Sequence, residues 1–154
     1  MRTRSLFLTL LVAAAALCAT GSCATSDKSY PVFTPDNLSG SMKLVGLNFA
    51  AVNVSLGGKD FDGAKAQLVH TRELLAVTIT FWRVRNKADA IRILRDTLTK
   101  MDDLDAALSG ETVDPAHATA MATQIGAHCQ ACHAIYRELN PGTKIYHLKA
   151  GPTP

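Results

Sequence analysis

The sequence predicts an all-α protein folded as an antiparallel up-down-up-down four-helix bundle. Four segments repeat apolar residues at spacings of three and four, the period of one face of an α-helix. Their similar lengths, roughly 33 Å each at 1.5 Å per residue, suit a bundle with short connections. Composition agrees, because 47% of the 154 residues are hydrophobic but only 6% are aromatic, a balance that favours helices over a β-sandwich.

The first predicted helix runs from Pro35 to about Leu56. Thr34 is suited to the N-cap, Pro35 to the first helical position, and Gly57-Gly58 to the stop. Because its apolar residues recur at helical spacing, we expect one face of this helix to lie in the core. That stripe consists of Leu38, Met42, Val45, Phe49, Val52 and Leu56.

The second predicted helix begins near Asp62, which can cap it, and continues to Phe81 or Trp82. The run from Val77 to Trp82 also has β propensity, so a frayed end or a short strand is the alternative there. We favour the helix, because one isolated strand has no strand to pair with.

The third and fourth helices have clear starts and stops. Asn86 and Asp89 resemble a capping pair before the third helix, whose end is expected at Gly110. The fourth helix starts with Asp114-Pro115 and is expected to reach Leu139, where Asn140-Pro141-Gly142 stops it. The apolar stripe of the third helix consists of Ala88, Ile91, Leu94, Leu98, Met101, Leu104 and Leu108.

The first 24 residues have the features of a secretory signal peptide, namely a basic start, an apolar stretch from Leu6 to Leu17, and small residues up to Ala24. The apolar stretch is too short to span a membrane. Cleavage after Ala24 would leave residues 25–33 as an N-terminal tether, 34–140 as the four-helix domain and 141–154 as a C-terminal tail. The alternative is a lipoprotein acylated at Cys23, and only then would the protein be attached to a membrane.

The exported chain is expected to be nearly neutral. The sequence has 16 basic and 13 acidic residues, and removal of residues 1–24 takes away Arg2 and Arg4, leaving 14 against 13 and a net charge of +1. This charge does not suggest a nucleic-acid-binding protein.

The segment Cys129-Gln130-Ala131-Cys132-His133 points to covalent haem attachment. Cysteines three residues apart lie on one face of a helix, so both thiols can form thioether bonds with one edge of a haem. His133 would then be the proximal iron ligand. The alternatives are a redox dithiol or half of a zinc site, but there is no second Cys-x-x-Cys and no βαβ pattern.

Met42 is the candidate for the distal iron ligand. In the predicted bundle the first helix starts beside the end of the fourth, and Met42 and His133 are both expected about 10 Å from that end. A Met–His pair suits reversible one-electron transfer, whereas Met42 as an ordinary core residue is the alternative. Phe49 and Ile91 are expected in the haem pocket, and His147 in the tail is a weaker candidate ligand.

The residues Cys129-Gln-Ala-Cys-His-Ala-Ile-Tyr136-Arg137 resemble the attachment site C-x-x-C-H-x-x-Y-R of the cytochrome c-prime superfamily. The segment from Met42 to Gly46 is similar to the M-K-x-x-G pattern of its six-coordinate, low-spin members, where the methionine is the sixth ligand. The segment from Gly57 to Asp62 looks like the family's glycine-lysine turn. Two features depart from the family: the Arg-Gln pair that often opens the first helix of five-coordinate members is absent, and the interval from Met42 to Phe61 is one residue shorter.

The resemblance implies a periplasmic monohaem c-type cytochrome that carries single electrons between a donor and an acceptor protein and is not an enzyme. The alternative within the family is a five-coordinate cytochrome that binds nitric oxide or carbon monoxide. Arg137 would lie near the proximal face of the haem. Members are often homodimers through their first two helices, so the resemblance also implies a homodimer as an option for this chain.

Overall fold

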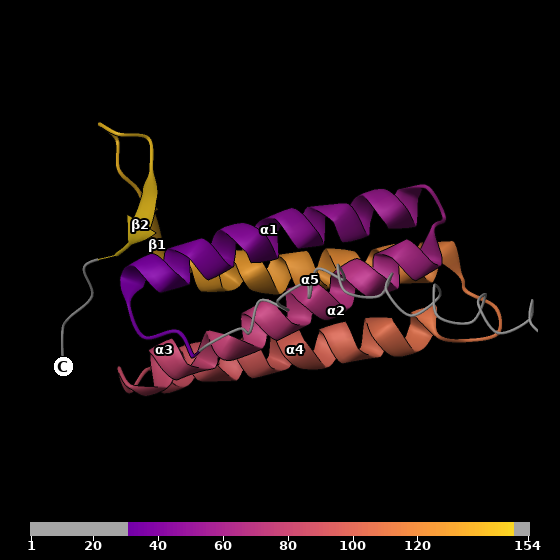
Figure 1. Ribbon diagram of the computed structural model, residues 1–154, viewed down its shortest axis with the longest axis horizontal. Coiled ribbons are helices and arrows are strands. Elements are labelled where there is room, and N and C mark those ends of the chain that lie inside the picture. Colours follow the sequence, from indigo (N-terminus) through magenta and orange to yellow (C-terminus); the bar gives the residue numbers. More distant parts are fainter. Residues whose placement is uncertain (1–30, 150–154) are drawn as a thin grey trace, which may run out of the picture.

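The computed structural model describes residues 31–149. The predicted signal peptide, Cys23, residues 25–30 of the predicted tether and residues 150–154 of the predicted tail lie outside this range. The described part is mainly α-helical, as predicted, with one small antiparallel sheet in addition (Figure 1). Its elements are α1 Pro35–Gly57, α2 Phe61–Val77, α3 Ile79–Arg83, α4 Ala88–Leu108, α5 Pro115–Tyr136, β1 Arg137–Leu139 and β2 Tyr146–Leu148.

The four long helices lie side by side (Figure 1). α1 packs on α2, α2 on α4, α4 on α5, and α5 on α1. The start of α1, helix α3, the start of α4 and the end of α5 all lie at one end of the molecule, on the left in Figure 1, which we call the α3 end. Consequently α1 and α4 both run in the direction opposite to α5. None of the described helices is long and apolar enough to cross a membrane.

The apolar stripes meet in a core between these helices. On α1 the predicted stripe faces inward, because four of its residues are buried and Met42 and Phe49 are half-buried against the core. Val32, in the segment predicted as a tether, is only 4% exposed and belongs to the same core. The four buried residues of the stripe are Leu38, Val45, Val52 and Leu56.

The predicted start of α1 is confirmed, and that of α2 is wrong by two residues. Thr34 Oγ1 accepts a hydrogen bond from the N–H of Asn37 at 3.1 Å, and α1 ends at Gly57. The left-handed residue of the following turn is Lys59 (φ 58°) rather than a glycine. Asp60, not Asp62, caps α2, because its Oδ1 accepts from the N–H of Gly63 at 2.9 Å.

The stretch after Val77 is helical, but it is a separate short helix rather than a continuation of α2. The N–H of Thr78 bonds to the carbonyl of Leu75, three residues back, at 3.1 Å. Its Oγ1 donates to the same carbonyl at 2.6 Å. This local side-chain bond competes with the regular helical pattern and marks the break between α2 and α3.

Asn86 and Asp89 do not form the predicted capping pair. Asn86 has a left-handed backbone (φ 53°), a conformation that asparagine tolerates better than most residues, and so turns the chain between α3 and α4. Lys87 occupies the N-cap position without a side-chain bond. Asp89 lies in the first turn of α4 and is used in another contact, described below.

The C-terminal part of the chain differs most from the prediction. Asp114 caps α5 as expected, but α5 ends at Tyr136, three residues before Leu139. Residues 137–139 and 146–148 pair as an antiparallel hairpin, so residues 141–149 are not a loose tail. Asn140 Oδ1 fixes the turn by accepting from the N–H groups of Gly142 and Thr143 at 2.9 and 3.0 Å.

Lys149 forms two hydrogen bonds with the end of α5. Its N–H bonds to the carbonyl of Tyr136 at 2.9 Å, and its Nζ donates to the carbonyl of Ala134 at 2.7 Å. The last carbonyls of a helix have no partners within the helix, so these two bonds satisfy groups that would otherwise need water.

Candidate functional site

Cys129 and Cys132 lie in the last two turns of α5, at the α3 end. Both are free thiols and half-buried, and Cys129 packs against the core. Because they are three residues apart in one continuous helix, their side chains share a helical face. The predicted geometry of two thiols on one face is therefore present.

The electrostatics of the pair do not suit a redox dithiol. Burial raises the pKa of the Cys129 thiol. Burial also raises the pKa of Cys132 to about 11, with smaller contributions from Cys129 and Asp89. Redox-active cysteines have lowered pKa values and are thiolates near neutral pH, whereas these two remain neutral thiols. In residues 31–149, no three His, Cys, Asp or Glu side chains group closely enough to hold a metal ion.

His133 is a neutral, half-buried imidazole that follows Cys132 directly. Burial lowers its pKa, and the positive charge of Arg137 lowers it further. Its Nδ1 is buried and has no hydrogen-bond partner. A neutral imidazole has the free lone pair that metal coordination needs.

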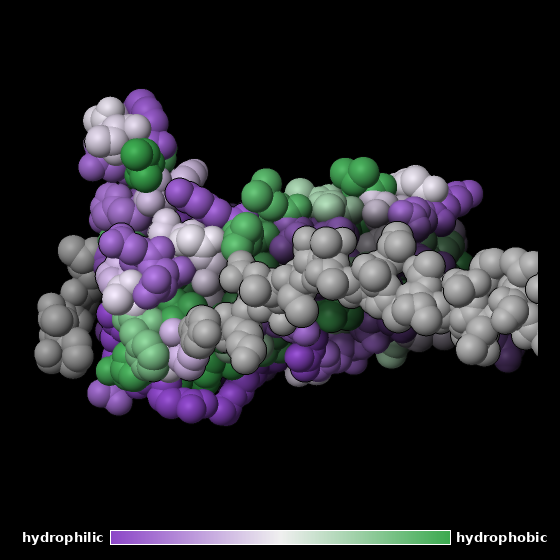
Figure 2. All heavy atoms as spheres, in the orientation of Figure 1, coloured by the Kyte–Doolittle hydropathy of each residue, from purple (hydrophilic) through white to green (hydrophobic). Residues whose placement is uncertain are grey.

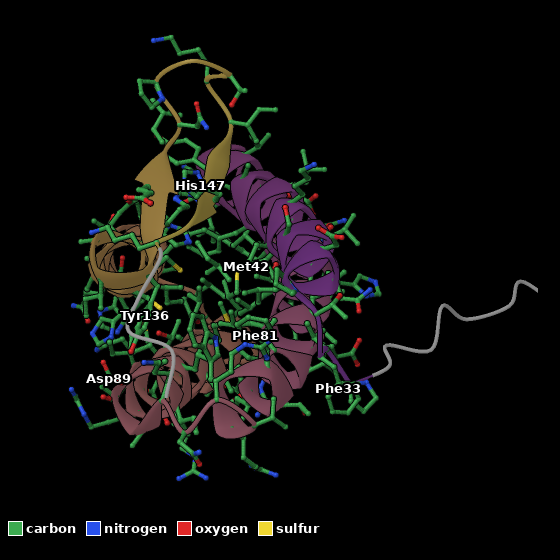
Figure 3. All side chains as sticks on the ribbon, turned by 90° about the vertical axis from the view of Figure 1, so that its left-hand side faces the viewer. Phe33, Met42, Phe81, Asp89, Tyr136 and His147 are labelled. Atoms are coloured by element: carbon green, nitrogen blue, oxygen red, sulfur yellow. The ribbon has the colours of Figure 1, made fainter. Side chains whose placement is uncertain are left out.

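Met42 is level with His133 on the facing helix. A Cβ atom placed on Gly126 of α5 would lie 3.8 Å from Cε1 of Phe49 on α1, which shows that these two residues face each other. Met42 precedes Phe49 by seven residues and His133 follows Gly126 by seven. Because the two helices are antiparallel with the same rise per residue, Met42 and His133 lie at about the same height. Figure 3 shows Met42 directed into the space between the helices.

The end of α5 does not lie level with the start of α1, as the sequence-based estimate assumed. With α5 ending at Tyr136, His133 lies only about 4.5 Å before the end of its helix, and Met42 about 10 Å after the start of α1. The two helix ends are therefore not level, although the two side chains are.

Ile91 and Phe49 both lie near this site, at different heights. The hydroxyl of Tyr136 bonds to Asp89, so Ile91, two residues further along α4, is level with the residue after His133. Ile91 is half-buried against the core. Phe49 lies about 10 Å deeper than Met42, two helical turns away, and packs beside Gly126.

Arg137 and His147 belong to the hairpin. Arg137 is the first residue of β1, and its guanidinium lies over the ring of Tyr146 with 4.1 Å from Cζ to the ring centroid. Nε2 of His147 lies 3.0 Å from Oε1 of Glu138 on the neighbouring strand. Figure 3 shows His147 on the hairpin, outside the space that Met42 enters. The structure therefore also makes His147 a weaker candidate ligand than Met42.

The structure also places together three residues whose contact the sequence does not reveal. The hydroxyl of Tyr136 donates to Oδ2 of Asp89 at 2.5 Å. The rings of Tyr136 and Trp82 have centroids 4.5 Å apart. Burial and the hydrogen bond to Asp89 raise the pKa of Tyr136, and the same bond lowers the pKa of Asp89. The cluster joins α3, α4 and α5 one turn beyond Cys132.

The donors at the α3 end fit a covalently bound haem. Two neutral thiols share one helical face, a neutral imidazole follows them, and a thioether is level with that imidazole on the facing helix. Comparison of the chain with protein-family models, curated proteins and solved structures gave no match.

Proposed function

We propose that this protein is a periplasmic monohaem c-type cytochrome of the c-prime type, an up-down-up-down four-helix bundle that carries single electrons. The observation that carries the proposal is the placement of Cys129, Cys132 and His133 on the last turns of α5, with Met42 level with His133 on α1. The raised pKa values of both thiols argue against the alternative of a redox dithiol.

Bound haem would supply a reversible one-electron couple at its iron. Cys129 and Cys132 would hold it by adding their thiols across its two vinyl groups. Each addition breaks the S–H bond of the thiol and the π bond of the vinyl group and forms one C–S and one C–H bond, so it needs neither an oxidant nor a reductant. His133 would hold the iron through one ring nitrogen and Met42 through its sulfur.

The surrounding residues would exclude water from this site. Ile91 and Met42 pack against the core at the height of His133, and Trp82 is 5% exposed. Ligation by a methionine sulfur raises the reduction potential of a c-type haem, and a dry pocket influences that potential as well. These residues hold and shield the cofactor, and the chain itself catalyses no reaction.

The partners we propose are a periplasmic electron donor and an acceptor protein, and the location follows from the predicted signal peptide. We also propose a homodimer through α1 and α2. The outer face of α1 exposes several large apolar residues, which Figure 2 shows along the upper edge of the molecule. These are Leu44, Leu47 and Val54, with Val69 on α2, at 47%, 68%, 76% and 41% exposure.

Covalent attachment is tested by expressing the full chain together with a c-type haem maturation system. We expect haem to stay with the denatured polypeptide, seen as a pyridine haemochrome spectrum. Replacing Cys129 and Cys132 together by alanine should abolish this signal. If the denatured wild-type chain releases its haem or carries none, the proposal is wrong.

The distal ligand is tested by Met42→Ala. We expect the ferrous wild-type protein to be low-spin and the variant to be high-spin and to bind carbon monoxide readily. Met121→Ala is the matched control, because Met121 is also half-buried against the core but lies on α5. A ferrous Met42→Ala protein that stays low-spin excludes Met42 as ligand. A high-spin wild-type protein that binds carbon monoxide supports the gas-binding alternative instead.

A further inference from the structure

Three buried side-chain polar atoms of residues 31–149 have no hydrogen-bond partner, namely Nε1 of Trp82, Nδ1 of His133 and Oδ1 of Asp105. Two of them lie at the α3 end, beside the candidate site. A buried donor without a partner costs about 1–3 kcal/mol, and native proteins pair nearly all such groups. The indole nitrogen of Trp82 can only donate. The buried indole N–H of Trp82 therefore lacks a hydrogen-bond acceptor.

Trp82 is held firmly in place at this site. It is 5% exposed, and its ring contacts Phe81 edge-on at 5.0 Å and Tyr136 at 4.5 Å between centroids. Tyr136 follows Cys132 by one helical turn, about 6 Å. The hydroxyl of Tyr136 is engaged with Asp89, and no hydrogen bond joins Tyr136 to the indole.

The periphery of a haem offers one kind of hydrogen-bond acceptor. Its methyl groups and thioether-bearing carbons accept none, whereas its two propionate groups end in carboxylates. Cys129 and Cys132 would fix the vinyl edge on α5, so the propionates would extend from the other edge of the macrocycle. A carboxylate is also the acceptor from which a buried N–H gains most.

We propose that Trp82 is a positioning residue for the cofactor, whose indole N–H donates a hydrogen bond to a haem propionate carboxylate. This inference rests on the proposed haem attachment. It explains why the only tryptophan of the chain has its N–H buried beside the haem-attachment motif without a protein acceptor. Titratable or charged groups near the aromatic cluster include Tyr136, Asp89 and Arg85, whose guanidinium lies 3.6 Å from the centroid of Phe81.

The single tryptophan allows a direct test on the holoprotein. After covalent haem has been verified by the pyridine haemochrome spectrum, ¹⁵N-labelled tryptophan gives one indole N–H resonance in the ferrous low-spin protein. We expect this proton to exchange slowly with solvent and to show nuclear Overhauser contacts with the propionate methylene protons. A resonance without these contacts overturns the proposal for Trp82 while leaving the haem in place. Absence of covalent haem overturns both proposals.

Trp82→Phe provides a second test, because it removes the donor and keeps an aromatic ring. A hydrogen bond stabilises the ionised propionate, so we expect the propionate-linked pKa in the pH profile of the reduction potential to rise by about one unit. Phe81→Leu disturbs the same aromatic pair but keeps the donor, and its pKa should match the wild type. If the profiles of Trp82→Phe and wild type superimpose, Trp82 does not bind the propionate.

Discussion

The hydrogen bond between Tyr136 and Asp89 should be a measurable link between the end of α5 and the start of α4. Tyr136→Phe removes the hydroxyl and keeps the ring against Trp82. Hydrogen bonds to charged groups contribute roughly 1.5–3 kcal/mol, but exposed charged pairs contribute at most about 1. Because Asp89 is exposed, we expect a loss of about 1 kcal/mol. In a domain of this size, that lowers the melting temperature by roughly 4 °C.

The assay is a double-mutant cycle with Tyr136→Phe, Asp89→Ala and the two combined, followed by thermal and urea unfolding of the holoprotein. The combined variant should be little less stable than either single variant, since each removes the same bond. Tyr146→Phe is the control, because Tyr146 is exposed and the structure shows no hydrogen bond from its hydroxyl. Effects that add to within about 0.3 kcal/mol would refute the proposed coupling.

Three further predictions concern pH, the core and the surface. The hydrogen bond from Tyr136 lowers the pKa of Asp89. The stability that this bond contributes is therefore present above the unfolded pKa of about 4 and is lost as the pH falls through the lower folded value. Urea unfolding should show wild type to be more stable than Tyr136→Phe at pH 7, and the two free energies of unfolding should converge at pH 2. Ile125→Ala, at a fully buried position, should cost about 3 kcal/mol in urea unfolding, whereas Ile135→Ala, on the same helix but 48% exposed, should cost under about 1. Leu47→Glu should convert a dimer into a monomer in analytical ultracentrifugation, and an unchanged mass would exclude this face of α1 as the interface.

Most helix boundaries could be predicted because their causes are local. Thr34 and Asp114 each accept hydrogen bonds from N–H groups two or three residues ahead, and proline at the first position needs no such bond. The prediction failed where the cause is distant. The end of α5 depends on Lys149, thirteen residues after Tyr136, and on strand pairing that no helical periodicity reveals.

The sequence did contain a local indication of the hairpin, although helical periodicity does not reveal it. Asn140-Pro141-Gly142 is a turn sequence, and Ile145 to Leu148 is a β-prone run after it. Residues 141–154 hold three of the six prolines of the chain, a composition that instead predicts a loose tail after a helix stop. The partner of the β-prone run is the three-residue segment before the turn, which still continues the apolar pattern of α5.

The sequence by itself determined the chemistry of the candidate site. The spacing of Cys129, Cys132 and His133 specifies two thiols on one helical face with an imidazole after them, and this depends only on the geometry of one helix. This prediction needs no knowledge of how the helices pack. Met42 was selected by its place on an apolar stripe together with the expected antiparallel order of the helices.

The tertiary structure alone decided which residues from other helices face that motif. Met42 and His133 lie at the same height because Phe49 packs against Gly126. Packing, and not the position of the helix ends, sets the register of two helices. The same packing buries Trp82 beside Tyr136 and leaves its N–H without an acceptor. Periodicity indicates which face of a helix turns inward, but only side-chain packing determines what that face meets.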